Sequence, residues 1–395
     1  MTRKTEGVTG VSRRKFIATT GAVGAAGVAG CTSDQSNNDD SNNDDDQSTD
    51  SPAGQSDDSD GETSGSATAT LRAEGSSTVY PISNKGSSYW NSNAPPSDGE
   101  YWGKNSETSV PGWDEIQTDK KIADYFASLY GFETTDQRSK PPYATIIGLS
   151  HSGTGCKAVR DGLVDIGNSS GPITAELGWS ESKANEEVVD HVVGRDGQPV
   201  VVSKDIYDAG VTQLTGEEIR KIYQNEITNW SEVGGPDQEI YAIGRAEGSG
   251  TDTSFRLNML GSADASMSGV DTRFGQNQQV ATAVQQNEGA IAYMALAFTG
   301  PQVKPIAINF EGTVYKPDKD AQNTIFDSSY PLNRDLHMYT KKTEETPNGT
   351  DKREAAFINM FLTTFGQVVF VEQNNYIPLP TKDIEKEKSK LPSQA

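Results

Sequence analysis

The feature that most constrains the fold of this chain is a strand that runs into a glycine-rich turn and then into a helix. Residues 239–243 alternate apolar and polar side chains, which is the period of a half-buried strand. The segment 244–251 follows and reads Gly-Arg-Ala-Glu-Gly-Ser-Gly-Thr. Its glycines can adopt backbone conformations that are closed to other residues, and Ser249 or Thr251 can cap the helix that is expected to end near Gly261.

A turn of this kind can bind an anion. It directs free backbone N–H groups and the positive end of a helix dipole at one point. Arg245 adds a guanidinium group whose geometry suits an oxyanion. A single such turn is more often an ordinary helix cap, so the interpretation depends on the other turns of the chain.

Three further strands end in turns rich in serine, threonine and glycine. The strand 67–73 leads through the turn 74–78 into a helix at 79–90, and the strand 143–149 leads through 150–155 into a helix at 156–162. A short strand at 164–167 runs into the turn 168–171. Strands that alternate with helices predict an α/β fold with mixed, mostly parallel sheets. Such sheets bind ligands at the carboxyl ends of their strands, where these turns would meet.

The remaining elements fit the same fold class. We expect a long loop at 91–112 and a helix at 119–130. Helices at 215–223 and 278–286 and strands at 198–202 and 289–293 belong to a second region. A late strand at 330–339 is followed by an amphipathic helix at 353–373. With 395 residues, the chain is long enough for two domains.

Composition excludes several classes of partner. The net charge is −22, from 56 acidic and 34 basic residues, which argues against nucleic acid and against anionic lipid as partners. An evenly acidic surface is typical of proteins from salt-loving organisms. The three histidines are scattered and the two cysteines, Cys31 and Cys156, are not expected to pair. We therefore predict no cofactor, no metal site and no disulfide framework.

The N-terminal residues carry a targeting signal. Residues 12–17 form a twin-arginine pattern, and a run of small apolar residues leads to Val-Ala-Gly-Cys at 28–31, which resembles a lipoprotein cleavage box. We expect 1–31 to be a signal peptide and the mature chain to carry lipid on Cys31. Residues 32–66 are almost wholly polar and acidic and are expected to form a disordered linker. No apolar run is long enough for a transmembrane helix in the mature chain.

One segment invites a catalytic interpretation. His151 is flanked by Ser150 and Ser152. In a serine hydrolase, a serine is the nucleophile and a histidine is its general base. Adjacent residues rarely have the geometry that nucleophile activation needs, and no orienting carboxylate follows in a recognisable context. We therefore rank a phosphoester hydrolase low and expect no enzymatic activity. We expect Cys156 to be a packed, unreactive thiol.

Four segments together resemble the phosphate-binding proteins of Pst-type ABC transporters. They are 75–81 (Gly-Ser-Ser-Thr-Val-Tyr-Pro), 152–155 with 164–167 (Ser-Gly-Thr-Gly and Val-Asp-Ile-Gly), 244–251 around Arg245, and 289–293 (Gly-Ala-Ile-Ala-Tyr). The segments 214–230 and 365–380 also fit this family, so the resemblance covers about residues 67–380. The Arg245 motif is its most specific part.

The resemblance implies a two-lobed, type II periplasmic-binding-protein fold that closes on its ligand about a hinge. Lobe 1 would comprise 67–198 and 331–395, and lobe 2 would comprise 199–330. The implied function is that of a monomeric, lipid-anchored receptor outside the membrane that delivers inorganic phosphate to the permease of an ABC transporter. The implied phosphate ligands are Ser77, Thr78, Val79, Ser150 or Ser152, Ser170, Arg245, Ser249, Gly250 and Thr251.

The chain departs from the family pattern in two places. Ser170 stands where many members have an aspartate that accepts the proton of monohydrogen phosphate and repels sulfate. Glu247 could supply a carboxylate, but we expect it to pair with Arg245 outside the pocket. The second departure is the long aromatic-rich stretch 87–142, which we interpret as a surface elaboration, with a lid or partner-binding role as the alternative. A receptor for sulfate or another tetrahedral oxyanion, or a phosphate sensor, therefore remains an alternative function.

Overall fold

A computed structural model describes residues 69–344, 346 and 348–395, which belong to one compact unit. The predicted signal peptide (1–31), the predicted lipidation site Cys31 and the whole predicted linker (32–66) therefore lie outside the described residues. Nothing in the structure tests those predictions.

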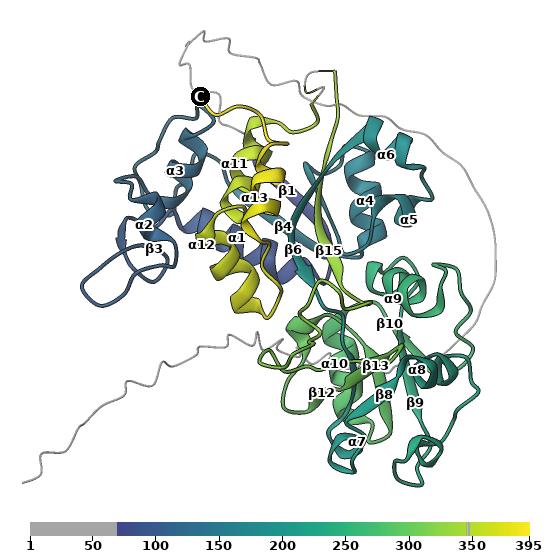
Figure 1. Cartoon of the computed structure of the whole chain (residues 1–395). Helices are drawn as coiled ribbons and strands as arrows, with labels where there is room; N and C mark the ends of the chain where they lie inside the picture. The colour runs from purple at the N-terminus through teal and green to yellow at the C-terminus, as the bar shows by residue number, and fades with distance from the viewer. Residues whose placement is uncertain (1–68, 345, 347) are drawn as a thin grey trace, which may run out of the picture. The chain divides into compact units, whose positions relative to one another are not determined.

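The first sheet has five strands in the order β4-β1-β5-β15-β6. The strand β1 (Leu71–Ser76) lies between β4 (Thr145–Ser150) and β5 (Ile166–Ser169) and runs parallel to both. The strand β15 (Arg334–Lys341) lies between β5 and β6 (Val188–Asp196) and is antiparallel to both. Figure 1 shows α4 on one side of this sheet and α1 and α11 on the other. The mixed sheet between helices confirms the predicted α/β fold class.

The second sheet has the order β10-β9-β11-β7-β12. Parallel pairing joins β9 (Tyr241–Arg245) to β10 (Thr272–Phe274) and to β11 (Ala290–Tyr293), whereas β7 (Val200–Ser203) and β12 (Val303–Pro305) are antiparallel to their neighbours. A third, small sheet consists of β14 (Thr313–Tyr315), β13 (Ala307–Phe310) and β8 (Gln213–Thr215).

The chain passes from the first sheet to the second between Asp196 and Val200 and returns before Arg334. We call the part built on the first sheet the first lobe and the part built on the other two sheets the second lobe. The boundaries given above for the two lobes remain a proposal. The helices of the first lobe are α1 (Tyr80–Ser92), α2 (Trp113–Ile116), α3 (Ile122–Ser128), α4 (Ser152–Arg160), α5 (Ile173–Leu177), α6 (Glu181–Glu187), α11 (Lys352–Phe361), α12 (Thr364–Gly366) and α13 (Thr381–Lys388). Those of the second lobe are α7 (Lys204–Asp208), α8 (Gly216–Tyr223), α9 (Gly250–Leu260) and α10 (Asn277–Gln286).

Two sequence-based expectations are wrong in detail. The amphipathic helix expected at 353–373 is broken into α11, α12 and a π-helical turn (Gln367–Val371), because the Thr363 side chain accepts a hydrogen bond from the Gly366 N–H and starts a new helix. From Glu354 to Phe361 every residue of α11 is buried, so this helix has no polar face. The strand β6 was not anticipated, because its apolar and polar residues do not alternate regularly.

Among the residues that the structure describes, no single helix has the length and hydropathy needed to cross a bilayer. The segments Lys352–Phe361 and Thr364–Asn374 meet those criteria only as a pair, and the pair is bent by 64°.

Four aromatic residues of the stretch 87–142, namely Trp90, Trp102, Phe126 and Tyr130, are buried in the core, so the interpretation of this stretch as a surface elaboration is wrong for them. A two-stranded hairpin, β2 (Ser97–Asp98) and β3 (Trp102–Gly103), interrupts the long loop expected at 91–112, and α2 follows that loop. Trp102 is fully buried, and its ring lies 5.2 Å from that of Trp113 and 5.3 Å from that of Phe365 near the C-terminus. The stretch is therefore held to the rest of the first lobe by apolar packing.

Replacing Trp102 by alanine is expected to lower the free energy of unfolding by about 3–5 kcal/mol, because it leaves a cavity among packed rings. Equilibrium unfolding in urea would measure this loss. Tyr101→Ala is the matched control, since Tyr101 is 38% exposed, and it should cost about 1 kcal/mol or less. Equal losses for the two variants would contradict a core role for Trp102.

Candidate functional site

Three helices begin at the junction of the two lobes without a side-chain cap. The N-cap residues are Val79 for α1, His151 for α4 and Ser249 for α9, and none of their side chains accepts a hydrogen bond from its helix. Ser249 occupies the N-cap position of α9 but its side chain does not cap the helix, and Thr251 lies inside α9, so the expectation that one of these side chains caps α9 is wrong. By contrast, α8 and α11 have complete capping boxes. Uncapped N-termini leave N–H donors free for a ligand.

Contacts between hydroxyl groups and between backbone groups link these three helix N-termini. The Thr78 Oγ1 of the first lobe lies 3.2 Å from the Thr251 Oγ1 of the second lobe. The Gly153 N–H, in the first turn of α4, donates to the Gly248 carbonyl oxygen at 3.1 Å. Gly248 has φ +77°, a left-handed conformation that favours glycine. The turns predicted to converge are therefore in contact.

A cluster of serines extends the site in the first lobe. The Ser170 Oγ lies 3.1 Å from the Ser76 Oγ, which donates to it, and 3.3 Å from the Ser152 Oγ. The Ser170 N–H also donates to Ser152 at 3.1 Å. The structure thus brings Ser152 into the cluster. Ser150 is not part of it, and its buried Oγ has no hydrogen-bond partner.

Arg245, at the end of β9, is 1% exposed. Its Nη1 donates to the Asn277 Oδ1 at 2.6 Å, and its Nη2 donates to the Gly275 carbonyl oxygen at 2.7 Å and to the Ser77 Oγ at 3.2 Å. Burial lowers the pKa of Arg245 to about 10, so it stays charged at neutral pH.

Arg245 has no ion-pair partner among the described residues. The expected pair with Glu247 is wrong, because Glu247 is exposed and the guanidinium turns inward to amide, hydroxyl and carbonyl oxygens. A buried charge without an opposite charge is costly, and an anion bound beside it would offset that cost.

A second buried guanidinium was missed by sequence reasoning. Arg334, at the start of β15, forms an ion pair of 2.6 Å with the fully buried Asp196. Its Nη1 donates to the Gly250 carbonyl oxygen at 3.2 Å, and its Nη2 lies 3.4 Å from the Thr78 Oγ1. Arg334 therefore contacts both lobes at the same place as the hydroxyl cluster. No sequence pattern links it to Asp196, because the two are 138 residues apart.

Two further polar side chains at this site were also not anticipated. The Asn277 amide, at the start of α10, donates to the Ser77 Oγ and to the Thr78 Oγ1, both at 3.1 Å. The Tyr376 hydroxyl donates to the Thr78 carbonyl oxygen at 2.6 Å. These bonds fix the turn before α1, and the Val79 side chain is buried in the core below it. The sequence indicated only that Asn277 stands at the start of an expected helix, and no pattern in it predicted a role at the site.

The catalytic alternative finds no support in the geometry. No hydrogen bond joins the His151 ring to a serine, and its Nδ1 is buried without a partner. The ring instead lies against Gly275. Burial raises the pKa of the Cys156 thiol, which is fully buried and therefore unreactive. Among the described residues, no group of three histidine, cysteine, aspartate or glutamate side chains could hold a metal ion.

Gly250 of the second lobe lies close against Ser152 and Gly171 of the first lobe. A Cβ atom at this position would stand 2.5 Å from the Ser152 Oγ and 2.8 Å from the Gly171 nitrogen. Gly250→Ala is therefore expected to hold the lobes apart and to weaken anion binding at least about tenfold with little change in the free energy of unfolding. Gly300→Ala is the control, because a Cβ there meets nothing within 4 Å. Unchanged affinity in Gly250→Ala would show that the lobes need not approach this closely.

Comparison with known proteins places this chain in a family. The family model of the PBP superfamily domain matches residues 127–369, which is more than half of the chain. The chain belongs to the PBP superfamily. This PBP-superfamily chain is 33% identical to the phosphate-binding protein PstS of Bacillus subtilis over 190 residues, covering 48% of this chain and 58% of that protein. It is 27% identical to the PstS of Staphylococcus saprophyticus over 62% of this chain and 74% of that one.

Solved structures share the fold of this PBP-superfamily member. A putative phosphate ABC transporter substrate-binding protein from Clostridium perfringens, solved with bound phosphate, is 20% identical with a TM-score of 0.56 and covers 79% of this chain and 100% of its own. An ABC-type phosphate transport receptor from Vibrio cholerae is also 20% identical, with a TM-score of 0.50, covering 78% and 100%. These similarities confirm the predicted periplasmic-binding-protein-like fold.

Proposed function

We propose that this chain is an extracytoplasmic receptor that binds inorganic phosphate for an ABC-type import system. The observation that carries the proposal is the buried guanidinium of Arg245, which has no carboxylate partner among the described residues and contacts Ser77 in the turn before α1. The starts of α1, α4 and α9 at this junction are all uncapped. The relatives named phosphate-binding protein, and the fold shared with a phosphate-bound structure, support phosphate as the anion.

The proposed binding mode needs no metal. Phosphate would accept hydrogen bonds from the N–H groups at the starts of α1, α4 and α9 and from the hydroxyls of Ser77, Thr78, Ser152, Ser170, Ser249 and Thr251. Arg245 would supply charge, and Arg334 would add a second guanidinium that Asp196 holds in place. Gly250 would let the lobes close around the anion. Ser150, which lies apart from the serine cluster, would have no direct role.

Calorimetric titration of the purified chain with phosphate and then with sulfate, in high salt, tests the proposal. We expect tight phosphate binding and compaction on binding by small-angle scattering. Failure to bind phosphate would overturn the proposed function.

A receptor for sulfate or another tetrahedral oxyanion is the second candidate. Ser170 favours it, because this residue is neutral and its oxygen already bonds to Ser76 and Ser152. A neutral turn does not repel an unprotonated dianion. Equal affinities for phosphate and sulfate in the titration would select this candidate.

We further propose that the chain is not an enzyme and works as a monomer anchored to the outer face of the membrane. The twin-arginine pattern and the cleavage box ending at Cys31 support export and lipid attachment. Replacing Cys31 by alanine should release the protein from the membrane fraction into the medium, and retention of this variant on the membrane would contradict the lipid anchor. Co-purification with permease subunits would distinguish transport from sensing.

A further inference from the structure

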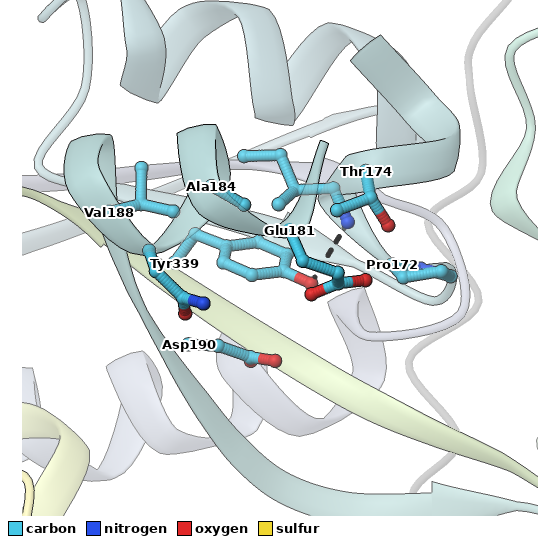
Figure 2. A pocket seen from close by; sticks show the side chains of 9 residues that line it. Pro172, Thr174, Glu181, Ala184, Val188, Asp190 and Tyr339 are labelled. Carbon is cyan, nitrogen blue, oxygen red and sulfur yellow. Dashed lines mark hydrogen bonds between the residues drawn. The ribbon is translucent and has the colours of Figure 1, made fainter. Parts of the chain in front are cut away.

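The helix α5 places one carboxyl group beside the candidate site. This helix follows directly from the serine turn at 169–172, and its start is anchored because the Ile173 N–H donates to the Tyr339 hydroxyl at 3.0 Å. Figure 2 shows this hydrogen bond as the dashed line, with Pro172 and Thr174 close to it. One turn further along α5 is Glu176. Its position is therefore tied to the turn that carries Ser170.

The Glu176 carboxyl is enclosed by elements of both lobes. Its Oε1 lies 2.8 Å from where a Cβ on Gly171 would stand, and its Oε2 lies 3.2 Å from the corresponding point at Gly153. From the second lobe, the Gly250 Cα lies 3.4 Å from the first of these points, and the Gly248 carbonyl oxygen lies 3.2 Å from the second. The Oε1 atom is buried and has no hydrogen-bond partner. The Glu176 side chain as a whole is half-buried, so contact between the lobes withdraws its Oε1 from water without giving this atom a partner.

The charges around Glu176 do not compensate for its burial. From β15, Arg334 and His337 favour the ionised carboxylate, whereas Asp252 on α9 opposes it. The thiol of Cys156 on α4 and the phenol of Tyr339 on β15 also face it and are neutral at physiological pH. Burial is the largest effect and raises the pKa of Glu176 to about 7. A phosphate bound beside the carboxyl would oppose ionisation further.

We infer that closing of the two lobes on phosphate is coupled to the uptake of one proton by Glu176. The inference rests on the proposed function. Glu176 would thus supply a titratable carboxyl close to the turn in which Ser170 has no carboxyl group. With the lobes apart, Glu176 loses the neighbouring backbone of Gly248 and Gly250 and ionises in the ordinary range of a glutamate. In the closed state an ionised Glu176 would lie close to the bound phosphate, and the two negative charges would repel each other. Glu176 therefore takes up a proton from solvent when the lobes close.

The sign of the coupling follows from the two pKa values. Between the ordinary pKa of 4.5 and about 7, the open form is ionised and the closed form is protonated. In this window each unit rise in pH should weaken phosphate binding about tenfold through this group. Below the window both forms are protonated, and above it both are ionised, so this contribution to the pH dependence disappears.

Calorimetry in two buffers of different ionisation enthalpy counts the protons exchanged on phosphate binding. At pH 6 the wild-type chain should take up close to one proton more than Glu176→Gln, and at pH 8.5 this difference should vanish. Comparison with the variant cancels the titration of phosphate itself. Glu181→Gln is the matched control, because Glu181 is exposed on the neighbouring helix α6, and it should behave as wild type.

The outcomes separate the two proposals. Phosphate binding with the same proton uptake in wild type and Glu176→Gln at pH 6 would overturn the inference and leave the proposed function intact. A proton difference that Glu181→Gln reproduces would also overturn it, because the effect would then belong to the general surface charge. No phosphate binding in any of the three proteins would overturn the proposed function and this inference with it.

Discussion

Replacing Arg245 by glutamine is expected to weaken phosphate binding by roughly 30- to 4,000-fold, which corresponds to about 2–5 kcal/mol. The guanidinium is buried and is held by Asn277, Gly275 and Ser77, so its charge acts on the bound anion through little intervening water. Glutamine retains part of the hydrogen bonding and removes the charge. Calorimetric titration with phosphate would measure the loss.

Two further variants make the Arg245 result specific. Arg245→Lys keeps the charge but loses the two-pronged donor geometry, so its loss of affinity should be intermediate. Arg160→Gln removes an arginine whose ion pair with Asp161 is on the surface, and phosphate affinity should not change. If Arg245→Gln bound phosphate as wild type does, this guanidinium would not be an anion ligand.

Replacing Asp196 by asparagine is expected to lower the free energy of unfolding by about 3–5 kcal/mol, because it leaves the Arg334 guanidinium buried without an opposite charge. Asp196 is fully buried, and its second oxygen accepts a hydrogen bond from the Leu296 N–H at 2.9 Å. Urea unfolding without phosphate would measure this loss.

The ion pair of Asp335 with Arg195 provides the control for Asp196. It has a similar length, 2.8 Å, but the Asp335 side chain is 42% exposed. Asp335→Asn should therefore cost at most about 1 kcal/mol. Added phosphate should also restore more stability to Asp196→Asn than to Asp335→Asn, since the anion can partly neutralise the unpaired Arg334. Equal costs for the two variants would contradict a special role for the buried pair.

The sequence predicted those parts of the site that depend on local patterns. The turns at Thr78, Ser152, Ser170 and Gly250 could be found because each follows a strand and opens a helix or a short helical turn. Their meeting follows from the carboxyl-edge rule for parallel strands, which β1, β4 and β5 obey.

The rest of the site depends on long-range pairing that no local pattern reveals. Arg334 and Asp196 come together because β15 and β6 pair in an antiparallel register, in which Arg334 lies opposite Asp196. The Glu176 carboxyl is withdrawn from water in part because Gly248 and Gly250 of the other lobe pack close to it. The direction of Arg245, inward instead of toward Glu247, is likewise set by the tertiary position of Asn277. The site residues that could not be predicted from the sequence are therefore those whose surroundings are formed by elements far away in the chain.

The place of β15 in the first sheet has a consequence for how the chain becomes a folded protein. This strand lies between β5 and β6, yet it is the last strand to be synthesised. Until residue 341 is available, β5 and β6 each present an unpaired edge, and the turn that carries Ser170 lacks the Tyr339 hydroxyl that anchors α5. Exposed strand edges of this kind are prone to aggregate. The early part of the chain must therefore be kept from self-association until its C-terminal strand arrives, and only then can the anion site form.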